Sequence, residues 1–151
     1  MREAVAGYRQ PTLESELDGA RQLLEAAGID CQIEHTAGTL PSGLDMVLAW
    51  TVREGVTNVI RHSRARRCLI RVTREHNSVC AEVSNDWYQG QKWEGTTKET
   101  GSGLSGLSER VRVHKGQMEA GPLLQEGKDG FHLRVELPLQ GSTEAMQEGK
   151  P

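Results

Sequence analysis

The chain reads Arg53-Glu54-Gly55-Val56-Thr57-Asn58-Val59-Ile60-Arg61-His62 at the end of its longest helical pattern, which begins at Ser42 or Leu44. One side of this pattern is small or apolar and consists of Leu44, Val47, Leu48, Thr51, Gly55 and Val59. A second stripe begins at Glu54. It continues with Asn58, Arg61 and His62, which follow Glu54 by four, seven and eight residues. An amide oxygen is a suitable ligand for Mg²⁺, and an arginine one turn further can meet a phosphate oxygen. A solvated polar face with incidental spacing is the alternative for this segment taken alone.

The flanking patterns predict a two-layer α+β sandwich, with a mostly antiparallel sheet and helices on one face. Thr12 is a predicted N-cap for a helix over residues 13–27, and Gly28 is its predicted C-terminal stop. Alternating residues predict strands at 29–35, 68–73 and 79–84, the last two joined by a turn at 75–77. Residues 85–103 are predicted to form a long binding loop or lid. A helix follows, ended by Gly116, and two strands at 117–120 and 131–137 complete the sheet.

Length and composition limit the possible classes of protein. The chain has 151 residues, which suits one domain, and a net charge of -3, which argues against a nucleic-acid partner. Three cysteines form no close pair, and Cys68 and Cys80 lie in apolar alternating runs, so they are predicted to be buried free thiols in a reducing compartment. No apolar stretch approaches the roughly 20 residues of a membrane span, and no signal peptide is recognisable. A cytoplasmic domain is therefore expected.

Two further motifs carry polar or glycine-rich chemistry. Val83-Ser84-Asn85-Asp86 closes a predicted strand with side chains that can read the edge of a base, although a turn of this composition is common. Gly101-Ser102-Gly103-Leu104-Ser105-Gly106-Leu107 runs into a helix, and glycines at a helix start let backbone N–H groups approach an anion. This segment is neither a Walker A loop nor a dinucleotide-binding fingerprint.

Taken together and in this order, the motifs resemble the nucleotide site of the GHKL ATPases, whose Bergerat fold is an α/β sandwich. Residues 53–63 resemble the N box of DesK/NarX-type sensor histidine kinases, and residues 101–111 resemble their second glycine box. The resemblance covers roughly residues 13–138. It implies a transferase of a two-component regulatory system that binds ATP and Mg²⁺.

The resemblance also implies roles for individual residues. Asn58 would hold Mg²⁺. Glu54 would be the catalytic acidic residue and would orient a magnesium-bound water. Arg61 and His62 would face the phosphates. The base would lie near Asn85 and Asp86. The phosphates would be wrapped by the backbone of Gly101, Gly103, Leu104 and Gly106. Phosphoryl transfer depends mainly on such positioning and charge neutralisation.

Two motifs depart from the family pattern. Asn85-Asp86-Trp87 stands where the first glycine box has an Asp, a variable residue and a Gly, and Gly130-Phe131 stands where a Gly-Thr supports the adenine. Asn85 can still accept a hydrogen bond through its amide oxygen. These departures are expected to affect the affinity for adenine.

The resemblance further implies a domain plan and partners. Residues 1–10 would be the tail of a dimerisation and phosphoacceptor region, residues 11–140 the catalytic domain, and residues 141–151 a disordered tail. The partners would be the kinase's own phosphoacceptor domain and a NarL-type response regulator, within a homodimeric, membrane-anchored parent. None of the five histidines precedes Asp or Glu, so this chain is not expected to phosphorylate itself.

Two other interpretations stay open from the sequence. One is a stand-alone GHKL regulator of the anti-sigma serine kinase type. The other is a degenerate, non-catalytic nucleotide-binding or interaction domain, which the departures at Asn85, Trp87 and Phe131 motivate.

Overall fold

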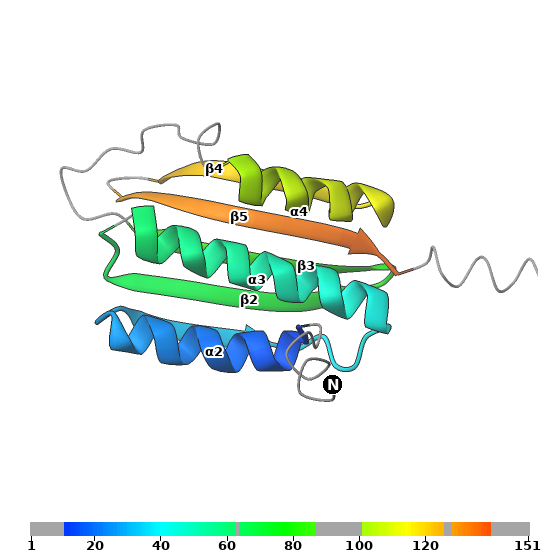
Figure 1. Ribbon diagram of the computed structural model, residues 1–151, viewed down its shortest axis with the longest axis horizontal. Helices are drawn as coiled ribbons and strands as arrows, with labels where there is room; N and C mark the ends of the chain where they lie inside the picture. Colours follow the sequence, from blue (N-terminus) through cyan, green and yellow to red (C-terminus); the bar gives the residue numbers. More distant parts are fainter. Residues whose placement is uncertain (1–10, 63, 87–100, 126–127, 140–151) are drawn as a thin grey trace, which may run out of the picture.

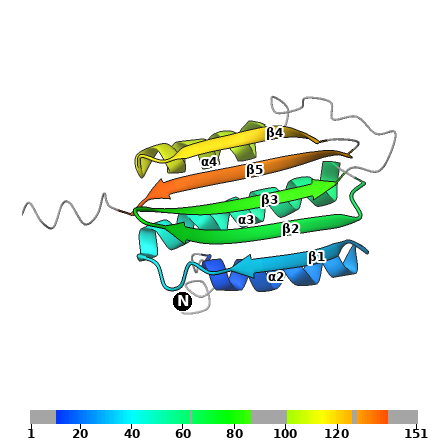
Figure 2. The same cartoon turned by 180° about the vertical axis from the view of Figure 1, so that it is seen from behind.

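A computed structural model describes residues 11–62, 64–86, 101–125 and 128–139, and these form two layers (Figure 1). One layer contains the helices α2 (Leu13–Ala26), α3 (Ser42–His62) and α4 (Gly101–Val113). The other is a sheet of β1 (Asp30–His35), β2 (Arg67–Glu75), β3 (Ser78–Asp86), β4 (Gln117–Gln125) and β5 (Lys128–Pro138). All three described helices cover the same face of the sheet, and Figure 2 shows the other face without helices.

The sheet has the strand order β1-β2-β3-β5-β4. β1 and β2 are parallel, and the other three pairings are antiparallel. The predicted two-layer α+β sandwich with a mostly antiparallel sheet is therefore confirmed.

The limits of α2 follow from local sequence, as predicted. Thr12 and Ser15 form a capping box in which each side chain serves the backbone of the other residue. At the other end Gly28 has φ +77°, and Ile29 N–H donates to the carbonyl of Leu24 at 2.8 Å. This is a Schellman ending, in which glycine takes the left-handed position without steric cost.

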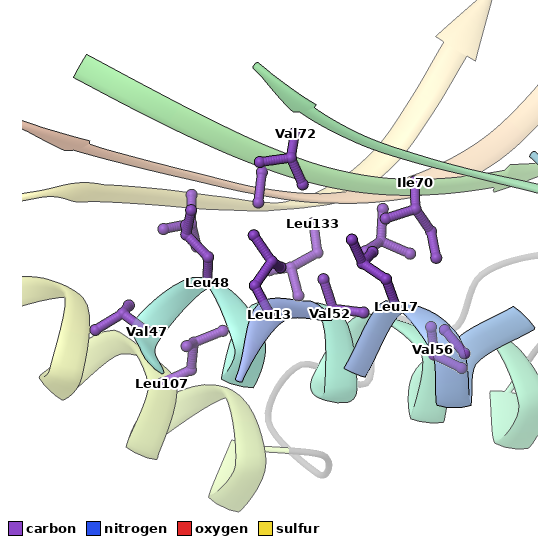
Figure 3. Packing of buried hydrophobic residues seen from close by; sticks show 14 of the residues in the cluster. Leu13, Leu17, Val47, Leu48, Val52, Val56, Ile70, Val72, Leu107 and Leu133 are labelled. Atoms are coloured by element: carbon purple, nitrogen blue, oxygen red, sulfur yellow. The ribbon is translucent and has the colours of Figure 1, made fainter. Parts of the chain in front are cut away.

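The core lies between the two layers and is built from alternating strand positions. Cys68, Ile70 and Val72 of β2 are at most 2% exposed, and β3 and β5 continue the same rows. Figure 3 shows Leu48 and Val52 of α3, together with Leu13 and Leu17 of α2, packed against Ile70, Val72 and Leu133 of the sheet. Each such aliphatic side chain contributes roughly 1.5–3 kcal/mol when fully buried.

Gly55 marks the closest approach of α3 to the sheet. A Cβ at this position would lie 2.7 Å from the Cβ and Cγ2 atoms of Val83 on β3. Because only a residue without a side chain fits there, Gly55 sets how closely α3 packs and fixes which of its residues lie over the end of β3.

The uncovered face of the sheet is polar and carries a row of alternating charges. The strand pairings align Glu34, Arg71, Glu82, Arg134 and Glu119, one from each strand. Arg71 Nε lies 3.0 Å from Glu34 Oε1. Opposite charges on neighbouring strands favour this register, so the face is stable in contact with water.

Several predicted boundaries and burials were wrong. Asn85 and Asp86 belong to β3, and residues 101–103 belong to α4, because backbone pairing and helix formation extend into the polar segment that was predicted as one loop. Strand β4 continues past residue 120, and strand β5 begins before residue 131, since the two strands pair as far as Gln125 and Lys128. Cys80 is half-buried because it points to the uncovered face.

The helix α4 ends before Gly116, as predicted. The residue with the left-handed backbone at this end is Lys115, with φ +60°. Gly116 is needed for a different reason, since a Cβ there would lie 2.5 Å from the backbone oxygen of Glu136. The glycine therefore marks close packing against β5 as well as the helix end.

The predictions for residues 1–10 and 141–151, and for the lid within 87–100, lie outside the described residues. Within the described part, none of the helices has the length and apolar character that crossing a membrane requires.

Candidate functional site

The end of α3, the end of β3 and the start of α4 lie at the same end of the molecule, which we call the site end (Figures 1 and 2). All three come from segments that the sequence analysis singled out. They are brought together because α3 runs along β3 in the same direction, while α4 runs back beside α3.

The register between α3 and α4 is fixed by two contacts. A Cβ at Gly43 would lie 3.3 Å from Nε2 of His114, and the guanidinium carbon of Arg110 lies 4.6 Å from the ring centroid of Trp50. The helices are therefore antiparallel. Moving eight residues forward from Trp50 reaches Asn58, and moving eight residues back from Arg110 reaches the first turn of α4. Asn58 is thus level with the glycine-rich helix start.

Three of the four residues in the predicted polar stripe of α3 have side chains without a partner among the described residues. Glu54 and Asn58 are half-buried and Arg61 is exposed. No described residue forms a hydrogen bond or ion pair with any of these three side chains. Half-buried polar groups without a partner among the described residues are candidates to bind a ligand. His62 is the last residue of α3, and its side chain lies outside the described residues.

The start of α4 offers backbone donors. Gly101 and Gly103 lie in its first turn, where N–H groups have no partner inside the helix. The first turn contains no acidic residue, and Leu104 is 5% exposed and anchors the turn to the core. Gly106 has open space on its side-chain side, since a Cβ there would meet no atom of the described structure within 4 Å. This turn can accept an anion.

The end of β3 presents Asn85 on the helix-covered face. The strand pairings set Asn85 between Cys68 of β2 and Phe131 of β5. Both Asn85 and Phe131 are 8% exposed, and the Asn85 Nδ2 atom donates to the carbonyl of Asp86 at 2.8 Å. The pairing therefore brings together two of the three residues at which the chain departs from the family pattern.

Asp86 points elsewhere. Its Oδ1 atom accepts hydrogen bonds from the backbone N–H groups of Arg66 at 2.8 Å and Arg67 at 2.9 Å. The carboxylate thus joins the end of β3 to the start of β2. Nothing in the arginine-rich segment before β2 indicates this contact, so it could not be predicted from the sequence.

Two other features could not be predicted either, one at the site end and one between α3 and α4. Cys68 lies beside Asn85, and burial, reinforced by Cys31 and Asp86, raises the pKa of its thiol to about 12. Trp50 lies between two guanidinium groups, with Arg53 at 4.7 Å and Arg110 at 4.6 Å from its ring. The i, i+3 spacing of Trp50 and Arg53 was a signal for the first contact, but nothing in the sequence indicates the second.

Within the described residues, no three His, Cys, Asp or Glu side chains converge as a metal site would require. A divalent ion at the site end would therefore depend on few protein ligands, in the manner of Mg²⁺ bound together with a phosphate chain.

No family model matches the chain. Two curated proteins of Bacillus subtilis are similar in sequence. Sensor histidine kinase DesK is 29% identical over 143 residues, which is 91% of this chain and 36% of DesK. Sensor histidine kinase YvfT is 28% identical over 118 residues, which is 77% of this chain and 31% of YvfT. The chain therefore spans about a third of the length of each.

Solved structures share the fold. The catalytic domain of histidine kinase ThkA superposes with a TM-score of 0.62 at 16% identity, over 83% of this chain and 89% of that domain. A blue-light activated histidine kinase domain of Erythrobacter litoralis superposes with a TM-score of 0.63 at 14% identity, over 88% of this chain and 64% of that one.

The two-layer architecture and these superpositions define the fold of a histidine kinase catalytic domain. In sequence the chain is similar to the sensor histidine kinases DesK and YvfT.

Proposed function

We propose that the chain is the Mg-ATP-binding catalytic domain of a sensor histidine kinase, and that it donates the γ-phosphoryl group of ATP to a histidine on another segment of the parent protein. The observation that carries the proposal is the position of Asn58, level with the first turn of α4 at the site end. An amide oxygen and a set of backbone N–H groups at the same level of two neighbouring helices would suit a magnesium-bound phosphate chain.

The described side chains fit this ligand. Asn58 would hold Mg²⁺ through its amide oxygen, and its lack of a partner among the described residues supports that role. Glu54 lies one turn before Asn58 and would orient a water molecule in the coordination shell. Arg61, exposed one turn further on, would neutralise phosphate charge together with His62. Bound Mg²⁺ would supply the charge neutralisation that phosphoryl transfer requires.

The α4 start and the end of β3 would hold the two ends of the nucleotide. The backbone of Gly101, Gly103, Leu104 and Gly106 would surround the phosphates. The base would lie over the buried row that contains Asn85 and Phe131. Phe131 can contribute only packing, so the polar recognition of the base would depend on Asn85.

The parent protein would supply what this chain lacks. We infer that a dimerisation and phosphoacceptor domain accepts the phosphoryl group, that the parent is a membrane-anchored homodimer, and that a NarL-type response regulator receives the signal. The relation to DesK and YvfT, of which this chain spans about a third, supports this arrangement over the stand-alone anti-sigma regulator.

Calorimetric titration with ADP and a non-hydrolysable ATP analogue, with and without Mg²⁺, tests the proposal. The wild-type chain should bind more tightly with Mg²⁺. Asn58→Ala should weaken Mg-nucleotide binding by about 10–100-fold, because a polar contact to a charged group is worth roughly 1.5–3 kcal/mol. The melting temperature should change little, since Asn58 has no described partner.

Asn77→Ala is the matched control, because Asn77 lies in the turn between β2 and β3, at the opposite end of the sheet from the site end. It should leave nucleotide binding unchanged. Absence of binding at millimolar nucleotide would favour the degenerate interaction domain. Equal binding by the wild-type and Asn58→Ala chains would remove the magnesium role.

A further inference from the structure

Asn85 is a buried amide that uses one of its two N–H donors within the described structure. Its side-chain nitrogen donates to the carbonyl of Asp86, and no described residue donates to its side-chain oxygen. A primary amide can rotate by half a turn and exchange its donor for its acceptor. The Asp86 carbonyl opposes that rotation, because it would then face an oxygen in place of an N–H group.

The position of the Asp86 carbonyl is itself held from two sides. The Asp86 carboxylate accepts two backbone hydrogen bonds from residues 66 and 67, which attaches it to the start of β2. On the other side, β5 passes so close that any side chain at Gly130 would overlap the backbone carbonyl oxygen of Asn85. The end of β3 is therefore fixed between its two neighbouring strands.

We propose that Asp86 is a positioning residue that fixes the orientation of the Asn85 amide, so that the amide presents an acceptor oxygen to the edge of the bound base. This inference rests on the proposed function, and it replaces the expectation that Asp86 contacts the nucleotide. It explains how an amide without charge can select a base that carries an amino group over one that carries an oxo group. A freely rotating amide would serve both bases.

Competition between ADP and GDP, both with Mg²⁺, measures the effect. The wild-type chain should prefer ADP by at least about tenfold, since an unmatched buried polar group costs roughly 1–3 kcal/mol. Asp86→Ala should reduce the preference to about threefold or less. Asp86→Asn keeps an oxygen that can accept both backbone hydrogen bonds, so it should restore the preference.

A double variant separates positioning from general destabilisation. In Asn85→Asp both carboxylate oxygens are acceptors, so orientation no longer matters. Adding Asp86→Ala to Asn85→Asp should leave the ADP preference within about twofold of that of Asn85→Asp alone. Glu82→Ala, on the uncovered face of the same strand, is the control and should retain the wild-type preference.

The outcomes for the two proposals are distinct. If the wild-type chain binds ADP and GDP equally, or if Asp86→Ala keeps the full preference, the positioning role of Asp86 is wrong while Mg-nucleotide binding stands. If Asp86→Ala reduces the ADP preference by the same factor in the wild-type chain and in the Asn85→Asp chain, its effect is general. The inference is then also wrong. If no nucleotide binds, the proposed function fails first.

Discussion

The two faces of α3 differ in what their residues contact, and the difference separates stability from binding in one helix. On the inner face Val47, Leu48 and Val52 are at most 1% exposed and pack on the sheet or on the neighbouring helices. On the polar stripe Glu54 and Asn58 are half-buried and have no described partner. A helix that only supported the fold would gain nothing from such a stripe, since half-buried polar groups without partners are costly.

The largest expected effect comes from the inner face. Leu48→Ala should lower the free energy of unfolding by about 2–5 kcal/mol, because it opens a cavity under a side chain that is 0% exposed. Urea unfolding measures the loss. Nucleotide affinity of the folded protein should be unchanged, and a large loss of affinity at unchanged stability would contradict the separation of the two faces.

Gly55→Ala tests the close packing of α3 on β3. The new Cβ would lie 2.7 Å from Val83, so the variant should lose about 1–3 kcal/mol of stability despite the higher helix propensity of alanine. Gly19→Ala is the matched control in α2, where nothing lies within 4 Å of a Cβ. It should gain up to about 1 kcal/mol. If Gly55→Ala and Gly19→Ala change the thermal stability equally, the close packing of Gly55 against Val83 does not limit the residue at position 55.

Trp50→Leu sharpens the comparison between helices. The indole contacts the guanidinium groups of Arg53 and Arg110, and Arg53 also pairs with Glu16 of α2 at 2.7 Å. Removing both cation–π contacts should cost about 1–2 kcal/mol, and Trp50→Phe should recover part of the loss. In Trp50→Leu, hydrogen exchange relative to the wild-type chain should accelerate more in α4 than in β2 and β3. Unchanged exchange in α4 would mean that the indole does not hold this helix.

The smallest effect is a pH dependence from the sheet beneath α3. The unfolded Cys68 thiol ionises near its ordinary pKa of 9.0, whereas burial raises the folded pKa to about 12. The stability that this thiol contributes is fully present below pH 9 and is lost as the pH rises toward 12, by at most about 1.4 kcal/mol per pH unit. Cys68→Val should flatten the decrease in urea midpoint between pH 8 and pH 10. An equal decrease in both proteins would exclude this thiol as a source.

The sequence was sufficient for the parts of the fold that depend on local chemistry. Thr12 and Gly28 marked the limits of α2, and alternation predicted β2 and β3, because caps and buried rows are properties of neighbouring residues. The close packing of Gly116 against β5 could not be predicted, because β5 is distant in sequence.

The candidate site shows the same division between local features and contacts that are distant in sequence. Asn58 and the glycine-rich segment could be singled out from spacing and residue type alone. The role of Asp86 could not be distinguished from that of Asn85 in the sequence. The partners of Asp86 are backbone N–H groups at residues 66 and 67, about 20 positions earlier. The contact of Arg110 with Trp50 likewise needs the register of two helices.

The central claim is that the end of α3 and the start of α4 bind one phosphate chain, and NMR titration with Mg-ADP tests it most directly. The side-chain amide of Asn58 and the backbone amides of Leu104 and Gly106 should shift together with a single dissociation constant, and the Asn58 shift should require Mg²⁺. Shifts confined to one of the two helices, or two different dissociation constants, would contradict the account.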